Sequence, residues 1–414
     1  MRRVGLFDTI CFSAVSVLIA VCLVFLYGGY ALGVFTLEEL PEESTHAFSE
    51  GLTDLAPALW QESMPAMADS AHHAALLSAD GTLLWGKDAH TSAGMASTTK
   101  IMTALLASEY IESVGEDAVT VVSESSSGIE GSSVYLKAGE EVRLVDLLYA
   151  TLLASANDAA ACLAEAVAES QDAFVALMNE RAKEYGLGST HFANPHGLAD
   201  TAHYTTAYEL GVIASYALQN DLFARVAKTK NYTFAGDGIT RTLTNHNRML
   251  VSYTGAVGVK TGFTKATGRC LVSAAERDGV LLIAVTLSAS NDWQEHAAML
   301  DHGFSLLERR LLLERAEISL SIPVVGGQTF SVTVRNEKEL SLVLPKGHRE
   351  LTCEIEVPSF VYAPIQKGDA VGKVVFYDNE KAVASCTLVA AESTECLAYE
   401  KTLSERILSF FGLG

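Results

Sequence analysis

Residues 96–105 read ASTTKIMTAL, and the assignment of the whole chain depends on this stretch. Ser97 stands three residues before Lys100, at the head of an apolar run that is typical of a helix. Residues three apart lie on one face of a helix, so these two side chains can meet. A serine is also a favoured helix N-cap. The rest of the chain has to distinguish a nucleophile with its base from a simple cap.

Length and charge limit the classes of protein to consider. The chain has 414 residues, which indicates about two domains with additional segments, and 49% of them are hydrophobic. There are 29 Lys and Arg against 50 Asp and Glu, a formal charge of −21. This balance argues against a nucleic acid partner bound through a broad basic surface.

The N-terminus predicts export. Arg2 and Arg3 precede an uncharged stretch whose core, Ile10–Tyr27, approaches the roughly 20 apolar residues of a membrane span. Positive charge before the span keeps the N-terminus in the cytoplasm and places the body on the extracytoplasmic face of a bacterial membrane. Residues 1–37 are therefore a signal or anchor, and both options stay open because 31–33 form a passable cleavage site. Residues 38–70 read as an acidic, polar stalk.

The seven cysteines give no metal or disulfide pattern. Cys11 and Cys22 lie in the apolar stretch, and the other five are scattered without zinc-site spacing. We expect those five to be mainly small buried hydrophobes with no disulfide framework. No H-E-x-x-H occurs, which argues against a metal hydrolase. We expect neither a metal nor another cofactor.

The central region predicts an α+β domain over residues 71–312. Residues 73–88 contain two apolar runs on either side of Asp80-Gly81, a strong hairpin turn signal. Helical periodicity dominates residues 97–188, and strands return around 257–263, where Lys260-Thr261-Gly262 stands at the start of a strand, followed by a hairpin that turns at 277–279. A last helix is expected over 293–312. These elements predict an antiparallel sheet of distant hairpins covered by helices.

The C-terminal region has a different character. Residues 313–393 consist of short alternating runs and predict a small all-β domain. In residues 394–414, Leu403, Ile407, Phe410 and Phe411 fall on one face of an amphipathic helix. That face can dock on protein or lie on a membrane surface, and the sequence favours neither.

Two further motifs change the interpretation of the opening stretch. Ser155-Ala156-Asn157 lies between two helical runs, and Lys260-Thr261-Gly262 lies in VGVKTGF. The order S-x-x-K, S-x-N, K-T-G is the signature of penicillin-binding proteins and class A β-lactamases. The flanks, including NPHGL and VGVKTGFTKATGRCLVSAA, resemble the serine-type D-alanyl-D-alanine carboxypeptidases among the low-molecular-mass penicillin-binding proteins. The resemblance covers roughly residues 70–310 and implies a β-lactamase/transpeptidase-like fold.

The residue types suit acyl transfer. A serine hydroxyl needs an adjacent base at neutral pH, and Lys100 can serve only when it is neutral. Burial and a nearby positive charge lower a lysine pKa, and Lys260 is the candidate for that charge. By resemblance, Ser155 relays a proton to the leaving amine and Asn157 hydrogen-bonds the substrate or Lys100. Without the other motifs, these two residues would read as a helix N-cap and a turn.

The third motif is expected to hold the substrate. A strand edge at Lys260 can pair with an extended peptide, with Gly262 allowing close approach of its backbone. Thr261 and Lys260 can bind a terminal carboxylate. Backbone N–H groups of Ser97 and Phe263 are the expected oxyanion hole. The alternative is an ordinary turn into an edge strand.

One departure from the family concerns carboxylate recognition. Some of these carboxypeptidases carry an arginine shortly after the strand that follows K-T-G, but here that region reads LSASNDWQEHAA. Recognition must then rest on Thr261, Lys260 or another group. Arg248 either helps to hold a carboxylate or forms a surface salt bridge. His196 is expected to shape a loop.

The resemblance therefore predicts a membrane-associated serine carboxypeptidase. Its substrate would be a peptidoglycan stem peptide ending in D-Ala-D-Ala, and β-lactam antibiotics would acylate Ser97. A β-lactamase, an enzyme acting on cross-links, and a non-catalytic module that binds wall peptides remain as alternatives.

Overall fold

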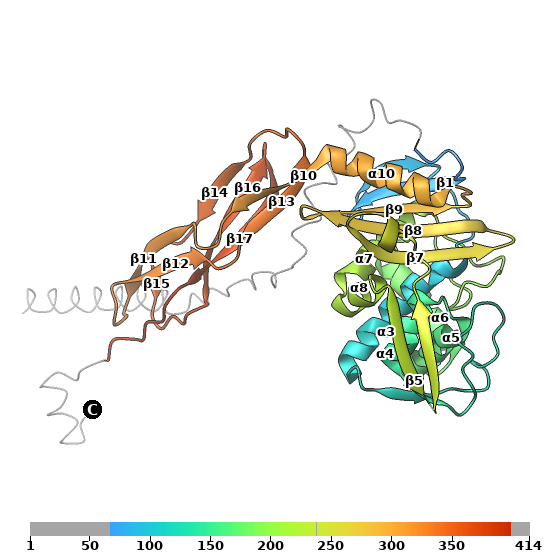
Figure 1. The fold of residues 1–414 in the computed structure, drawn as a ribbon. Coiled ribbons are helices and arrows are strands. Elements are labelled where there is room, and N and C mark those ends of the chain that lie inside the picture. Colours follow the sequence, from blue (N-terminus) through green and yellow to red (C-terminus); the bar gives the residue numbers. More distant parts are fainter. Residues whose placement is uncertain (1–66, 237, 399–414) are drawn as a thin grey trace, which may run out of the picture. The chain divides into compact units, whose positions relative to one another are not determined.

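A computed structural model describes residues 67–236 and 238–398 (Figure 1). The predicted signal or anchor, most of the stalk and residues 399–414 of the predicted amphipathic helix lie outside this range. Among the helices of the described residues, none has both the length and the apolar character needed to cross a membrane.

A five-stranded antiparallel sheet organises the first domain, with the strand order β2-β1-β9-β8-β7. Both predicted hairpins are present and turn at Gly81 and Asp278-Gly279, which have the positive φ angles that such tight turns require. β1, the first strand in the chain, pairs with β9, the last strand of this sheet, and β7 lies at one edge. The five strands are β1 (His73–Ser78), β2 (Leu83–Lys87), β7 (Ala256–Thr264), β8 (Gly268–Arg277) and β9 (Val280–Leu287).

The sheet is covered on both faces, which explains why β9 is apolar throughout. Ile283 and Val285 belong to the core shared with the helical part of the domain. Leu282 and Ala284 point the other way and pack with residues of α10 (Asp292–Leu306). Figure 1 shows α10 on one side of the sheet and α7 (Ala207–Gln219) on the other. The strand therefore reads as a continuous hydrophobic run instead of an alternating one.

The helical part confirms the predicted periodicity between residues 97 and 188. Its central helix, α3 (Lys100–Val114), is buried along most of its length. The helices packed around it are α4 (Leu144–Leu153), α5 (Asn157–Ala168), α6 (Gln171–Glu184), α7 (Ala207–Gln219) and α8 (Asp221–Ala227), and the short α9 (Met249–Ser252) lies against β7. Two short two-stranded sheets complete the domain, namely β3 (Val119–Val121) with β4 (Glu141–Arg143) and β5 (Asn231–Gly236) with β6 (Ile239–Thr244).

The helix predicted over residues 293–312 is too long. It ends at Leu306, and residues Leu307–Leu313 form strand β10, which pairs with β13 (Leu340–Pro345). Leu, Glu and Arg are good helix formers, but helix propensity is a small term per residue, and strand pairing over this length overrides it. The domain predicted to end at residue 312 therefore ends in a strand whose partner lies in the following β-rich region.

The C-terminal domain is all-β, as predicted. Its larger sheet has the order β14-β16-β17-β12-β11-β15. In β12 the residues alternate, so Val332 and Val334 enter a core that also holds Leu342 and Leu344 of β13. The remaining strands are β11 (Ser319–Val325), β12 (Ser331–Asn336), β14 (Thr352–Glu356), β15 (Val361–Tyr362), β16 (Ala370–Asp378) and β17 (Lys381–Ala390).

The prediction that the five scattered cysteines are mainly buried is wrong. Only Cys162 and Cys270 are buried, in the first domain. Cys353 and Cys396 are exposed and Cys386 is half-buried, because thin β-rich structure offers few fully enclosed positions.

Candidate active site

Ser97 lies in a tight 3-10 turn, η1 (Ala96–Thr99), immediately before α3. The hydroxyls of Thr98 and Thr99 donate to the carbonyls of Met95 and Ala96, at 2.5 and 2.7 Å, and hold the turn. Both threonines are buried, whereas Ser97 is half-buried and lines a cleft of about 890 Å³. The local sequence thus presents one hydroxyl to the cleft and uses its neighbours as structural supports.

Lys100 is fully enclosed and bound to three acceptors. Its Nζ lies 3.1 Å from Ser97 Oγ and 2.7 Å from Asn157 Oδ1, and it also donates to the His196 carbonyl. Burial lowers the pKa of Lys100 well below its usual value, and the positive charge of Lys260 lowers it further, while Asp158 acts in the opposite direction. The expected pairing of Ser97 with Lys100, and the expected contact with Asn157, are therefore present in the geometry.

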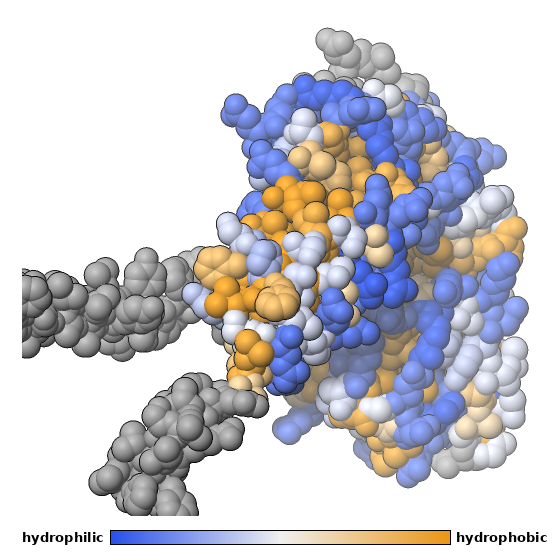
Figure 2. Space-filling model, turned by 90° about the vertical axis from the view of Figure 1, so that its left-hand side faces the viewer, coloured by the Kyte–Doolittle hydropathy of each residue, from blue (hydrophilic) through white to orange (hydrophobic). Residues whose placement is uncertain are grey.

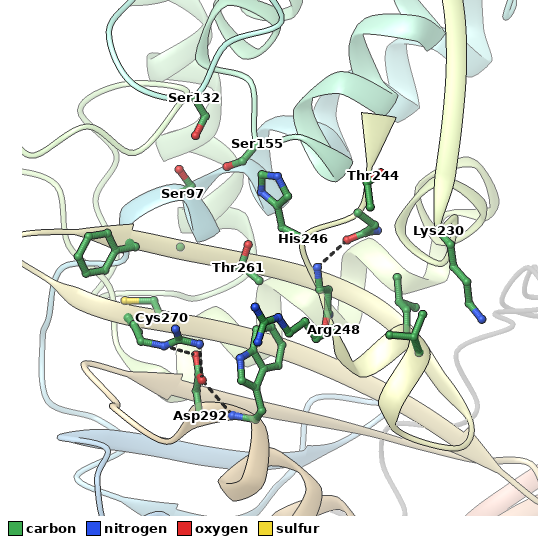
Figure 3. Close-up of a pocket in the computed structure, with 18 of the residues that line it drawn as sticks. Ser97, Ser132, Ser155, Lys230, Thr244, His246, Arg248, Thr261, Cys270 and Asp292 are labelled. Carbon is green, nitrogen blue, oxygen red and sulfur yellow. Dashed lines mark hydrogen bonds and ion pairs between the residues drawn. The ribbon is translucent and has the colours of Figure 1, made fainter. Parts of the chain in front are cut away.

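The second motif reaches the cleft from the loop between α4 and α5. Ser155 has a φ of 59° and is 5% exposed, and Figure 3 shows its hydroxyl directed toward those of Ser97 and Ser132. Asn157 begins α5 and is fixed from both ends, because its Nδ2 donates to the Glu130 carbonyl at 2.6 Å and its backbone N–H donates to the Ser132 carbonyl at 2.7 Å.

The third motif lies in the middle of β7 and not at its start. Lys260 is 1% exposed and its Nζ donates to the Thr261 carbonyl at 2.9 Å. Burial lowers the pKa of Lys260 to about 7. Thr261, Gly262 and Phe263 line the cleft, and the Phe263 ring is 65% exposed.

Gly262 has a structural role that the sequence did not predict. We expected the glycine to admit a ligand backbone, but a Cβ at this position would lie 3.0 Å from Ser97 N and 3.1 Å from Met95 O. The missing side chain therefore lets β7 approach the turn that carries Ser97. This contact also places the backbone N–H of Ser97 beside Gly262, the residue before Phe263.

The N-P-H-G loop supports the same turn from the other side. A Cβ on Gly197 would lie 2.0 Å from the Ala96 carbonyl oxygen, and the His196 ring is buried, with its pKa lowered to about 3 by burial. His203 accepts from the Ala193 N–H through Nδ1, so its neutral ring donates from Nε2 to Thr99 Oγ1 at 2.6 Å. Both histidines help to fix the conformation of this loop and of the turn that carries Ser97, which is the loop-shaping role expected for His196.

Two arginines line the cleft, on the side that includes Thr261. Arg248 precedes α9, and within residues 67–236 and 238–398 it forms no ion pair. Its predicted position beside the site is confirmed, whereas the alternative of a surface salt bridge is not seen. Arg269 of β8 pairs with Asp292 at the start of α10 (Figure 3).

The sequence matches two families of known proteins. The sequence model of a family described as D-alanyl-D-alanine carboxypeptidase matches residues 61–291, more than half of the chain. The chain belongs to this family. A second model, described as the C-terminal domain of penicillin-binding protein 5, matches residues 308–395. The predicted family, the enzyme class of peptidase and the fold class of a transpeptidase-like domain followed by a β domain are confirmed.

Individual relatives agree. The chain is 31% identical over 335 residues to D-alanyl-D-alanine carboxypeptidase DacF of Bacillus subtilis, covering 79% of this chain and 86% of that protein. The corresponding DacC of Escherichia coli is also 31% identical, with coverages of 77% and 82%. Penicillin-binding protein 5 of Haemophilus influenzae superposes with a TM-score of 0.60 at 26% identity, covering 81% of this chain and all of that one. The Streptomyces K15 DD-transpeptidase gives 0.55 at 32% identity, with coverages of 59% and 100%.

Several residues of the peptidase cleft escaped the sequence analysis. Ser132 lies in the segment GSSVYL and lines the cleft. The loop that carries it is fixed by Asp158, which accepts from Ser133 Oγ at 2.6 Å and Leu136 N at 3.0 Å. No local signal marks these positions, because only the fold brings them together. Other cleft residues that were not predicted include Lys230, Arg269, Asp292 and Trp293.

Proposed function

We propose that this peptidase removes the terminal D-alanine from peptidoglycan stem peptides by way of an acyl-enzyme on Ser97. The observation that carries the proposal is the 3.1 Å contact between Lys100 Nζ and Ser97 Oγ, in surroundings that lower the lysine pKa. A neutral lysine can accept a proton, and a serine hydroxyl becomes an effective nucleophile only with such a base beside it.

The first half-reaction forms an ester. Ser97 Oγ attacks the carbonyl carbon between the two D-alanines while its proton passes to Lys100. The tetrahedral oxyanion is stabilised by the backbone N–H groups of Ser97 and Phe263, since donors fixed in advance favour the developing charge. The C–N bond then breaks, and the proton held by Lys100 passes through the Ser155 hydroxyl to the leaving amine, which returns Lys100 to its neutral form. The terminal D-alanine departs with its carboxylate.

Water completes the cycle. It attacks the acyl carbonyl and gives a proton to Lys100, which returns it to Ser97 Oγ as the ester bond breaks and the shortened peptide leaves. Asn157 holds Lys100 in place through the 2.7 Å contact and contributes to substrate binding. Thr261 on the edge strand β7 binds the substrate, and Lys260 in its protonated form supplies nearby positive charge. Penicillins acylate the same serine and deacylate slowly.

The test uses the wild-type protein and a Ser97→Ala variant. Both are incubated with a diacyl-Lys-D-Ala-D-Ala tripeptide, free D-alanine is assayed, and a fluorescent penicillin is applied in parallel. We expect release and labelling in the wild type and neither in the variant, with unchanged thermal stability. A folded Ser97→Ala protein with full activity would exclude this mechanism.

A second candidate is transfer of the acyl group to an amine acceptor. The similarity to the Streptomyces K15 DD-transpeptidase favours it, because the acyl-enzyme is the same in both reactions. Penicillin labelling without D-alanine release from the tripeptide, followed by product formation when an amino acceptor is added, would favour transfer. Release of free amine from cross-linked peptide would instead indicate endopeptidase action.

The remaining rivals differ in deacylation or in the need for catalysis. A β-lactamase hydrolyses its penicilloyl ester rapidly, so persistent fluorescent labelling argues against that activity. A module that only binds wall peptides has no use for a buried lysine beside a serine hydroxyl. Binding of the tripeptide without release or labelling would favour it.

We also propose that the peptidase works on the extracytoplasmic face of the membrane and is attached to it. The uncharged stretch Ile10–Tyr27 and the apolar positions of residues 399–414 support this. Figure 2 looks onto one end of the β domain and shows hydrophobic surface gathered there. Exposed apolar residues at this end are Val325, Phe330, Phe360, Tyr362 and Leu397. Flotation of the full chain with phospholipid vesicles, compared with a variant truncated after Ala398, tests the contribution of residues 399–414.

A further inference from the structure

The cleft lacks the carboxylate-binding arginine expected after β9, because the connection from Ser288 to Asn291 carries no basic residue. A peptide ending in D-alanine nevertheless brings a negative charge into this site. The basic side chains that line the cleft are Lys230, Arg248 and Arg269. The surroundings of these side chains show which one is best placed to bind a carboxylate.

Arg269 is the one placed beside the substrate-binding strand. It lies directly opposite Phe263 in the β7–β8 ladder, two positions along from the pair formed by Thr261 and Leu271. Paired residues of an antiparallel ladder share a face of the sheet, as do residues two apart on one strand. The side chains of Arg269 and Thr261 therefore project on the same face of this strand pair.

The guanidinium of Arg269 is also held in advance. Its Nε donates to Asp292 Oδ2 at 3.0 Å and its Nη2 donates to Asp292 Oδ1 at 2.7 Å, while the group lies 5.7 Å from the centre of the Trp293 ring. The Asp292 side chain is only 4% exposed, whereas that of Arg269 is 44% exposed. Among the described residues, Nη1 has no acceptor, so the outer edge of the guanidinium can bind a ligand.

Arg248 lacks such an anchor. No side-chain hydrogen bond or ion pair fixes it within the described part of the chain, so binding through Arg248 would have to order a long side chain. A guanidinium that is already fixed loses less conformational entropy when a carboxylate arrives.

We propose that Arg269, held by Asp292 and Trp293, binds the terminal carboxylate of the substrate together with Thr261. The proposal rests on the proposed carboxypeptidase function and names the group that selects a free C-terminus. Asp292 acts as a positioning residue. The same contact serves the carboxylate of a penicillin.

The experiment compares substrates with and without the carboxylate. The tripeptide ending in D-Ala-D-Ala and its C-terminal amide are assayed with wild type and with Arg269→Gln. We expect the wild type to prefer the free acid, and Arg269→Gln to raise KM for the acid about ten- to a hundredfold, the range for a charged hydrogen bond. Turnover of the amide should not change, so the preference is lost.

Matched arginine variants provide the controls. Arg277 stands at the other end of β8 and is likewise paired, with Asp301, and stacked on Tyr253, so Arg277→Gln should keep the wild-type preference. If Arg269→Gln keeps the preference, the proposal fails. If Arg248→Gln alone abolishes it, Arg248 is the carboxylate ligand and the proposal fails as well.

A penicillin arm separates this proposal from the reaction itself. If the tripeptide is not cleaved but Ser97 is still labelled, acylation by benzylpenicillin is compared with acylation by its methyl ester. A loss of discrimination in Arg269→Gln supports the role of Arg269 whatever the physiological reaction is. Retained discrimination overturns it. Melting temperatures of all variants show whether the fold is intact, and Arg269→Lys, which keeps the charge without the fork, should recover part of the preference.

Discussion

Replacing Gly262 by alanine should disturb the nucleophile without touching any catalytic side chain. The new Cβ would lie 3.0 Å from Ser97 N and 3.1 Å from both Met95 O and Thr98 N. All three are backbone atoms of the turn that carries the nucleophile, so no flexible side chain can yield. Either β7 or the turn has to move by a few tenths of an ångström.

The size of the effect follows from that displacement. A misplacement of about 1 Å at a reacting group costs roughly a hundredfold in rate. A shift of a few tenths of an ångström should therefore lower acylation of Ser97 by about three- to tenfold. Overpacking of this kind costs about 1–3 kcal/mol of stability, so the Gly262→Ala protein should remain folded.

Two other glycines make the prediction a graded series. Gly188 has open space around its Cβ position, so Gly188→Ala is the control for the exchange itself. Gly197 is the severe case, because its Cβ would lie 2.0 Å from the Ala96 carbonyl oxygen and its φ is +88°. Gly197→Ala should lower acylation by about a hundredfold or more and lower the melting temperature, because both the clash and the left-handed backbone oppose it.

The assay is the second-order rate constant for labelling by a fluorescent penicillin, measured with the melting temperature of each variant. The expected order of rates is Gly188→Ala equal to wild type, then Gly262→Ala, then Gly197→Ala. Wild-type acylation in Gly262→Ala would refute the idea that contact between β7 and the turn positions Ser97. An equal loss in Gly188→Ala would show that the exchange acts by another route.

Three further predictions concern charge and pH. Lys260→Met removes one of the two causes that lower the pKa of Lys100, so that pKa should rise and the acid limb of the acylation–pH profile should move to higher pH. Glu140→Ala leaves the guanidinium of Arg241 buried without its partner and should lower the free energy of unfolding by about 3–5 kcal/mol, measured by urea denaturation. Burial lowers the pKa of His296 to about 3, below the 6.5 of a free histidine, so the unfolded state binds the proton first. The contribution of His296 to the free energy of unfolding is therefore fully present above pH 6.5. Below that pH it falls by about 1.4 kcal/mol per pH unit. In His296→Gln, the free energy of unfolding should fall less steeply as the pH is lowered.

Each of these has its own control. Recovery of acylation at raised pH separates the Lys260→Met effect from lost substrate binding, and an unmoved acid limb would argue against charge coupling. Glu339→Ala breaks an exposed pair with Arg309 and should change stability by less than about 1 kcal/mol. A similar loss in both glutamate variants would mean that burial does not determine the cost. Identical pH slopes for wild type and His296→Gln would show that this histidine does not contribute to acid sensitivity.

Local sequence patterns were sufficient where backbone preferences decide the outcome. The Asp-Gly turns at 80–81 and 278–279 predicted both hairpins, and the helical periodicity between residues 97 and 188 predicted the helices. The prediction failed at Leu307–Leu313, where leucines and charged residues suit a helix equally well. Pairing with β13, a partner distant in the chain, decided that segment.

The same division applies to the site. The spacing of Ser97 and Lys100 alone brings their side chains together, because residues three apart lie one turn apart in a helical turn. The order of the three motifs indicated the family without any coordinates. Only the tertiary structure decided what surrounds Lys100 and how Gly262 and Arg269 are used. Enclosure of the lysine, the approach of β7 to the turn and the anchoring of Arg269 by Asp292 all join segments far apart in the chain, and local sequence preferences carry no information about such contacts.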